Sequence, residues 1–215
     1  DGDGVPDEVS VFEEGLAAPY GLIADGDDLI VSHKPELLRL RDSDGDGRAD
    51  VRQVIADGWG YTDDYHDWTT GIVRDTHGNL YVGTGSDYAK PGRDSEKARW
   101  RGKVLQIQKT GEITPLGHAF RYPTGLAIDA DDQVFVTDNQ GVQNTFNEIN
   151  HLVPGASYGV PSLYEENRDA PATVPAIQVP HPWTRSINGV FFLPRDWGAM
   201  DAKTGRHPFA GHGIG

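Results

Sequence analysis

The chain has 215 residues, a formal net charge of −14 at pH 7 and no cysteine, which excludes disulfides, thiolate metal sites and a cysteine nucleophile. The negative charge argues against a nucleic-acid partner, because such binding relies on Lys and Arg to neutralise phosphates. No run of about 18 apolar residues is present, so we expect no membrane-spanning segment and a single domain over residues 1–215.

The first eight residues are acidic and rich in glycine. Asp1, Asp3 and Asp7 are spaced as in the later part of a calcium loop whose first ligand is missing. We therefore predict these three carboxylates as metal ligands, and we expect the chain to be truncated at its start.

A short β-hairpin is predicted at residues 21–31 and is repeated along the chain. The segment reads as an apolar strand, a tight Asp-rich turn and a second apolar strand. Copies begin at Gly71, at Gly125 and, more weakly, at Gly189, spaced by roughly 50 to 65 residues. A repeat of this length with about four short strands is typical of a β-propeller, so the predicted fold class is all-β.

The number of repeats bears on how much of the propeller is present. Four hairpin copies predict about four blades, and residues 211–215 resemble the approach to a further strand. We therefore expect part of a six-bladed propeller, truncated at both ends. A closed four-bladed ring is the alternative, and it would bring the two termini close together.

A fuller acidic loop follows the first hairpin. Carboxylates of Asp42, Asp44, Asp46 and Asp50 occupy loop positions 1, 3, 5 and 9, and the backbone carbonyl of Arg48 is available at position 7. Hard oxygen ligands at this spacing are typical of a Ca²⁺ loop. Position 12 is a glutamine and no helix pattern flanks the loop, so it resembles thrombospondin type 3 or dockerin loops more than an EF-hand. Strands predicted over 37–41 and 51–55 make this calcium structural, and the alternative is an acidic turn without metal.

Three chemically capable residues precede successive hairpins. His66, Arg121 and Arg185 lie four or five residues before the glycines that open the second, third and fourth copies. If each innermost strand lines a central channel, these side chains converge at one end of it. The Pro-rich stretch over 167–182 is expected to be an extended surface loop.

The residue types at these positions suit acid–base chemistry on an anionic site. His66 is a natural general base near neutral pH, and Asp64, Asp67 or Asp87 could orient it. Arg121 and Arg185 would bind an anionic cofactor or substrate. The alternatives are a turn histidine without catalytic role and arginines in surface salt bridges.

The order of these motifs resembles the soluble pyrroloquinoline quinone (PQQ) sugar dehydrogenases, including the glucose and sorbosone types. The resemblance covers nearly the whole chain and is carried by His66, Arg-x-Pro-x-Gly at 121–125, Glu-Ile-Asn at 148–150 and Tyr-Gly-x-Pro at 158–161. The Asp-rich loop followed by His66 looks most like secreted, often cytochrome-fused dehydrogenase-like propellers of planctomycete-type bacteria.

The resemblance implies specific roles. His66 would remove the hydroxyl proton of a sugar or alcohol while hydride passes to the quinone, and Asp87 would orient His66. Arg121 would contact the quinone, and the backbone carbonyls of Gly141 and Val142 would hold an active-site Ca²⁺. Electrons would pass to an external acceptor such as a cytochrome c. Calcium supply favours an extracytoplasmic location, periplasmic or secreted.

The sequence departs from the pattern of these dehydrogenases at three positions. Tyr122 stands where the family has Asn after the arginine, Ser86 separates the glycine from Asp87, and Val142 stands where the family has Pro. These departures affect a polar cofactor contact, the placement of the orienting acid and the calcium site, respectively.

Two other readings of the chain remain open. One is a non-catalytic, calcium-stabilised NHL-like propeller that binds protein or glycan through loops rich in Trp and Tyr. The other is a metal-dependent lactonase-type propeller, in which Asp138, Asn139 and Glu148 hold one divalent ion.

Overall fold

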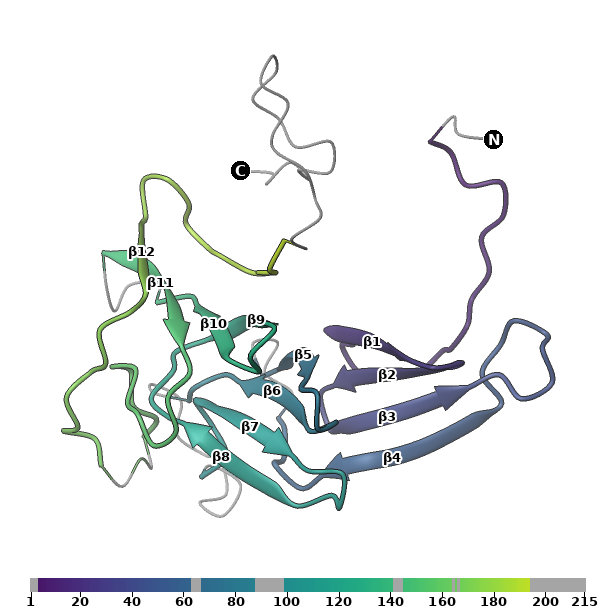
Figure 1. Cartoon of the computed structure of the whole chain (residues 1–215), viewed down its shortest axis with the longest axis horizontal. Helices are drawn as coiled ribbons and strands as arrows, with labels where there is room; N and C mark the ends of the chain where they lie inside the picture. Colours follow the sequence, from purple (N-terminus) through teal and green to yellow (C-terminus); the bar gives the residue numbers. More distant parts are fainter. Residues whose placement is uncertain are drawn as a thin grey trace.

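The computed structural model describes residues 4–62, 67–87, 99–140, 145–163, 165 and 167–193. Within these residues the regular structure is entirely β, in three four-stranded antiparallel sheets that do not close into a ring. The sheets lie next to one another along an arc (Figure 1). We call them blade 1 (β1–β4), blade 2 (β5–β8) and blade 3 (β9–β12).

In each blade the strands pair in chain order, as expected for a meander. The strands are β1 Gly21–Asp25, β2 Asp28–His33, β3 Glu36–Arg41, β4 Val51–Asp57, β5 Thr69–Arg74, β6 Leu80–Thr84, β7 Lys103–Ile107, β8 Ile113–Gly117, β9 Pro123–Ile128, β10 Val134–Asp138, β11 Phe146–His151 and β12 Ile177–Pro180. The first three predicted hairpins are therefore confirmed as β1–β2, β5–β6 and β9–β10.

The hairpin turns of blades 2 and 3 are closed by an aspartate. One carboxylate oxygen of Asp75 accepts the backbone N–H of Asn79 at 2.8 Å, and Asp129 accepts that of Gln133 at 2.9 Å. A short acidic side chain that bonds the backbone four residues on offers the chain a tight turn instead of a longer strand. In these two hairpins the aspartate therefore marks where the first strand ends and the turn begins.

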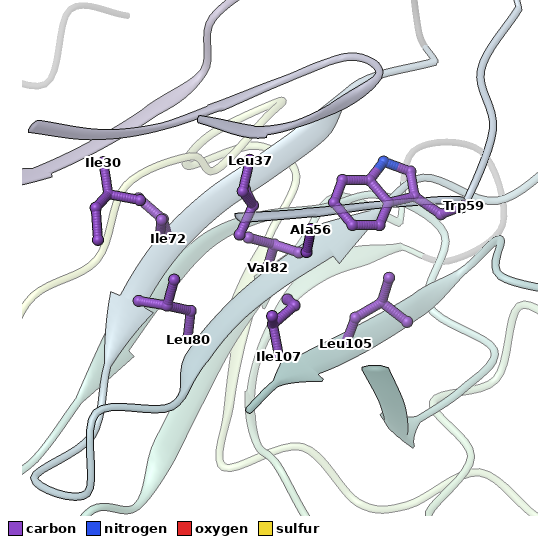
Figure 2. Packing of buried hydrophobic residues seen from close by; sticks show 9 residues of the cluster. All are labelled: Ile30, Leu37, Ala56, Trp59, Ile72, Leu80, Val82, Leu105 and Ile107. Carbon is purple, nitrogen blue, oxygen red and sulfur yellow. The ribbon is translucent and has the colours of Figure 1, made fainter. Parts of the chain in front are cut away.

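Apolar side chains fill the spaces between successive blades. In β6, Leu80 and Val82 face blade 1, whereas Tyr81 belongs to the cluster shared with blade 3. This alternation is the two-residue period of a strand that is buried on both faces. Figure 2 shows the cluster between blades 1 and 2, which consists of Ile30, Leu37, Ala56, Trp59, Ile72, Leu80, Val82, Leu105 and Ile107. Burying each large aliphatic side chain contributes about 1.5–3 kcal/mol.

A hydroxyl group links the inner two strands of each blade to the blade that follows. The three bonds run from Ser32 Oγ to the Gly71 carbonyl at 2.8 Å, from Thr70 Oγ1 to the Pro123 carbonyl, and from Thr137 Oγ1 to the Asn188 carbonyl at 2.5 Å. In each blade a glycine is the cross-strand partner of the hydroxyl residue, and it leaves room for the incoming carbonyl. Residues 187–189 therefore take the place that the inner strand of a fourth blade would hold.

Two expectations about strands need correction. The stretch 167–182, predicted as a surface loop, contributes β12, because Ile177–Pro180 pairs with β11 at the outer edge of blade 3. The fourth copy, opening at Gly189, forms no strand among the described residues, although its position against blade 3 matches that of the earlier copies. The described chain thus contains three complete blades, not four.

The face of blade 1 that is turned away from blade 2 is covered by the N-terminal segment. Phe12 and Leu16 pack on Val31, Leu38 and Leu40. An apolar groove of about 300 Å³ remains between this segment and blade 1. The described part of the chain has no helix that is long and apolar enough to cross a membrane.

Candidate functional site

The ends of the inner strands of blades 2 and 3 bring the predicted Asp87 and Arg121 together. Asp87 follows the end of β6 and is 5% exposed, while Arg121 precedes β9. The backbone N–H of Ser86 donates to the carbonyl of Arg121 at 2.9 Å. The residues on either side of this bond therefore lie at the same end of the two blades.

The Arg121 side chain is half-buried and is anchored by its own blade. Its guanidinium Nη1 donates to the carbonyl of Asn139 at 2.8 Å. The backbone N–H groups of Arg121 and Tyr122 both donate to the carboxylate of Asp138, at 3.0 and 2.6 Å. Arg121 is therefore held in position by two residues at the end of β10 and just after it.

Asp138 is the most deeply buried acid at this end of blade 3, with no exposed surface. Burial raises the pKa of Asp138 to about 7, although the N–H bonds from Tyr122 and Arg121 act in the opposite direction. Burial also raises the pKa of Glu148, its cross-strand partner on β11. The charge of Glu148 further disfavours the ionised form of Asp138.

A glutamine that sequence reasoning did not single out links these two acids. Gln140 Nε2 donates to Asp138 at 2.5 Å and to Glu148 at 3.3 Å, and Asn150 Nδ2 donates to Glu148 at 3.0 Å. The side chain of Asn139 instead donates to Ser186 Oγ at 2.8 Å. The set proposed for a lactonase-type metal site is therefore divided between two hydrogen-bond networks.

Arg185 lies on the same side of blade 3 but is exposed. Its neighbour Ser186 accepts the bond from Asn139, whose own carbonyl accepts the guanidinium of Arg121. Asn139 thus bonds both the Arg121 side chain and the residue that follows Arg185. No hydrogen bond of the Arg185 guanidinium is defined among the described residues.

His66, Gly141 and Val142 lie outside the described residues, so the structure does not test their predicted roles. The described residues that flank His66 are firmly held. Asp67 accepts both the backbone N–H of Thr62, at 2.5 Å, and its hydroxyl, at 2.9 Å. Asp67 also forms an ion pair with Arg101, and the two side chains are 3% and 2% exposed. Nothing in the local sequence marks Arg101 as buried, which is why this pair was not predicted.

The acidic loop between β3 and β4 brings three carboxylates close together. Carboxylate oxygens of Asp42, Asp44 and Asp46 lie within 4.8 Å of one another, the only such acidic or histidine group among the described residues. Gly45 and Gly47 have φ values of 80° and 86°, which favour glycine. The loop is thus curled so that three hard oxygen ligands point to one region.

The remaining predicted ligands of this loop are placed differently. Asp50 is bound by Ser43, whose backbone N–H and hydroxyl donate at 2.9 and 2.5 Å. The N–H of Arg48 donates to Asp46 at 2.9 Å, so the Arg48 carbonyl is the group left for a cation.

The first predicted loop lies in the N-terminal segment. Asp7 of this loop is exposed. Asp1 and Asp3 lie outside the described residues, so the first predicted loop stays a prediction.

If Ca²⁺ occupies the loop, chelation is expected to lower the melting temperature. The three carboxylates repel one another without a cation between them, and the loop that carries them joins β3 to β4. The measurement is a thermal melt with and without a chelator, for the wild type and for Asp44→Asn, with Asp131→Asn as the exposed acidic control. An unchanged melt after verified metal removal would contradict a structural calcium.

Comparisons with known proteins found a matching family model and solved structures of similar fold. A family model described as "Domain of unknown function (DUF7133)" matches residues 1–190, and no curated protein matches the sequence. Three solved structures illustrate the similarity. A candidate oxidoreductase (glucose dehydrogenase) from Thermus thermophilus is 21% identical with a TM-score of 0.58, over 86% of this chain and 63% of its own.

Two fungal structures are more distant. The holo form of the pyranose dehydrogenase PQQ domain from Coprinopsis cinerea is 13% identical with a TM-score of 0.56, over 72% of this chain and 44% of its own. The calcium structure of a Trichoderma reesei carbohydrate-active enzyme of family AA12 is 16% identical with a TM-score of 0.50, over 66% and 43%. At these identities the similarity shows the fold, which confirms the predicted all-β propeller. The chain spans less than two thirds of the length of each of these structures.

Proposed function

This chain belongs to the DUF7133 family, and we propose that it forms part of a PQQ-type oxidoreductase that oxidises a hydroxyl group of a sugar or alcohol. The observation that carries the proposal is that the backbone bond from Ser86 to Arg121 places Asp87 and Arg121 at the same end of successive blades. The fold is shared with structures described as glucose and pyranose dehydrogenases, which supports the same class of reaction.

The residues present fit a quinone that carries carboxylates. Arg121 is anchored at Nη1 by the carbonyl of Asn139 and stays half-buried, and Arg185 is exposed on the neighbouring repeat. Guanidinium groups pair with carboxylates through two parallel donors, so these two arginines would hold the carboxylates of PQQ. When bound, the quinone supplies an acceptor for the hydride from the substrate carbon.

The protein's own contribution would be proton transfer and positioning. His66 would take the proton of the substrate hydroxyl, so that loss of this proton and of the hydride leaves a carbonyl product. Asp87, buried behind the site, would orient His66 and stabilise its protonated form. The pair Asp67–Arg101 and the two bonds from Thr62 would fix the ends of the segment that carries His66.

Further elements of the proposal concern metal, partner and location. The carbonyls of Gly141 and Val142 would hold an active-site Ca²⁺, in addition to the structural Ca²⁺ at Asp42–Asp46. A cytochrome c or a similar external acceptor would take up the electrons. Loops of this type fill readily at extracellular calcium levels, so we place the protein in the periplasm or outside the cell.

A combined binding and activity experiment tests the function. The Ca²⁺-loaded full-length protein is titrated with PQQ by absorbance, and reduction of an artificial dye is measured with a panel of aldoses and alcohols. We expect stoichiometric binding with turnover. His66→Ala should lower kcat by at least about 100-fold, the contribution of one general base, while PQQ binding and the thermal melt are retained.

His77→Ala is the matched control, because His77 is an exposed histidine in the β5–β6 turn. This variant should keep wild-type kcat. If His66→Ala keeps full turnover, the assignment of the base is wrong. If the wild type neither binds PQQ nor reduces the dye, the function is wrong, and a non-catalytic propeller that binds protein or glycan becomes the better reading.

A further inference from the structure

The connection from β11 to β12 leaves blade 3 and binds the end of blade 2. The backbone N–H of His118, just after β8, donates to the carbonyl of Ala156 at 3.0 Å, and the His118 carbonyl accepts the N–H of Tyr158 at 2.9 Å. These bonds form a short parallel bridge between the two segments. We call residues 153–163 and Glu165, which belong to this connection, the strap.

Two side-chain contacts fix the strap on blade 2. The ring of Tyr158 stacks on that of Phe120, with centroids 4.2 Å apart and an angle of 15° between the planes. Lys103 Nζ, on β7, lies 2.9 Å from both carboxylate oxygens of Glu165, and these side chains are 11% and 9% exposed. Such a pair resists separation, because opening it would leave two uncompensated charges in the interior. The strap is therefore a fixed part of the boundary between blades 2 and 3.

A buried serine of the strap reaches two loops of blade 2. Ser162 is 1% exposed, and its hydroxyl donates to the carbonyl of Arg101 at 3.1 Å. The same oxygen lies 3.2 Å from the hydroxyl of Ser86. A hydroxyl has one proton and two lone pairs, so Ser162 can donate to the carbonyl and accept from Ser86 at once. The surroundings are tightly packed, because a Cβ added to Gly102 would lie 3.0 Å from Ser162 Oγ and 2.9 Å from the carbonyl oxygen of Phe120.

Both loops lie next to groups of the proposed proton transfer. Arg101 forms the buried ion pair with Asp67, the residue that follows His66. Ser86 directly precedes Asp87, which is 5% exposed. One hydroxyl group from blade 3 therefore bonds the backbone of the ion-paired arginine and the neighbour of the proposed orienting acid.

We propose that Ser162 is a positioning residue for the proton transfer. Its hydroxyl fixes the spacing between Arg101 and Ser86, and thereby the position of Asp87 relative to the segment that carries His66. This inference rests on the proposed function, because only that function gives Asp87 and His66 their roles. Since Ser162 comes from blade 3, the geometry of the proton-transfer groups depends on how blade 3 packs against blade 2. A misplacement of about 1 Å in such groups can cost up to about 100-fold in rate.

The test is Ser162→Ala, followed by turnover and by amide hydrogen exchange. In the Ca²⁺-loaded full-length protein with PQQ and dye, kcat should fall about five- to tenfold while the KM of the sugar or alcohol stays unchanged, because Ser162 is buried behind the two loops. Exchange is followed at the amides of Ser86 and Gly102, which donate to the carbonyls of Arg121 and Gly85. Both amides should exchange about fivefold faster than in the wild type.

Ser157→Ala is the matched control, because Ser157 is a serine of the same strap and is 6% exposed, and no side-chain hydrogen bond is defined for it in the described part of the chain. It should keep wild-type kcat and exchange rates, and thermal melts show whether each variant is folded. Unchanged kcat in folded Ser162→Ala would overturn the positioning role, even with faster exchange, because the contact would then be structural only. An equal loss of kcat in Ser157→Ala would overturn it as well. In both cases wild-type turnover leaves the proposed function standing. If the wild type gives no dye reduction with any substrate, the function is wrong, and the role of Ser162 falls with it.

Discussion

Gly21→Ala is expected to lower the melting temperature by about 6–12 °C. A Cβ at this position would lie 2.3 Å from the carbonyl oxygen of Gly71 and 2.7 Å from Ser32 Oγ. Neither atom can move freely, because the Ser32 hydroxyl donates to that same carbonyl across the interface of blades 1 and 2. Overpacking a rigid contact of this kind costs about 3 kcal/mol, and about 2–4 °C is lost per kcal/mol in a domain of this size.

Gly189→Ala is the matched control for this prediction. Gly189 opens the fourth copy of the same sequence pattern, yet a Cβ there would meet no atom within 4 Å, and its φ is not in the left-handed region. We therefore expect a melting temperature within about 1–2 °C of the wild type, as is usual for surface substitutions. Equal melting temperatures for the two variants would show that the spacing between blades does not depend on the glycine.

Much of this architecture could be predicted from the sequence because it is repetitive. The glycine that opens each hairpin recurs where the next blade comes close, and the acidic turn recurs where the inner strands end. The outer strands lack such markers. β12 was missed because Ile177–Pro180 lies in a proline-rich stretch and is an edge strand, where only one neighbour defines it.

The candidate site, too, could be predicted only in part from the sequence. Asp87 and Arg121 could be named as candidates because each lies next to a repeated hairpin, and their roles stay predictions. The bridge from Gln140 to Asp138 and Glu148 could not, because it depends on burial and on side-chain rotamers that no local pattern encodes. Burial is also what separates these acids from the equally acidic but more exposed residues of the loop at Asp42–Asp50.

The buried ion pair of Asp67 and Arg101 leads to the second large prediction, for Arg101→Met. Methionine keeps the apolar stem but removes the cation, so Asp67 would keep a buried charge that still accepts the N–H and hydroxyl of Thr62 but has lost its guanidinium. Breaking one side of a buried pair costs about 3–5 kcal/mol. We expect the free energy of unfolding, measured by urea denaturation, to fall by this amount.

A double-mutant cycle separates the pair from simple loss of packing. In Arg101→Met combined with Asp67→Asn, an uncharged amide oxygen can still accept both bonds from Thr62, so the double variant should regain a substantial part of the loss. Arg52→Met is the surface control, because Arg52 is 45% exposed and its ion pair with Glu13 spans 3.7 Å. Such a pair contributes at most about 1 kcal/mol. A loss for Arg101→Met no larger than that for Arg52→Met would mean that water reaches Asp67, and that the segment before β5 does not depend on the ion pair.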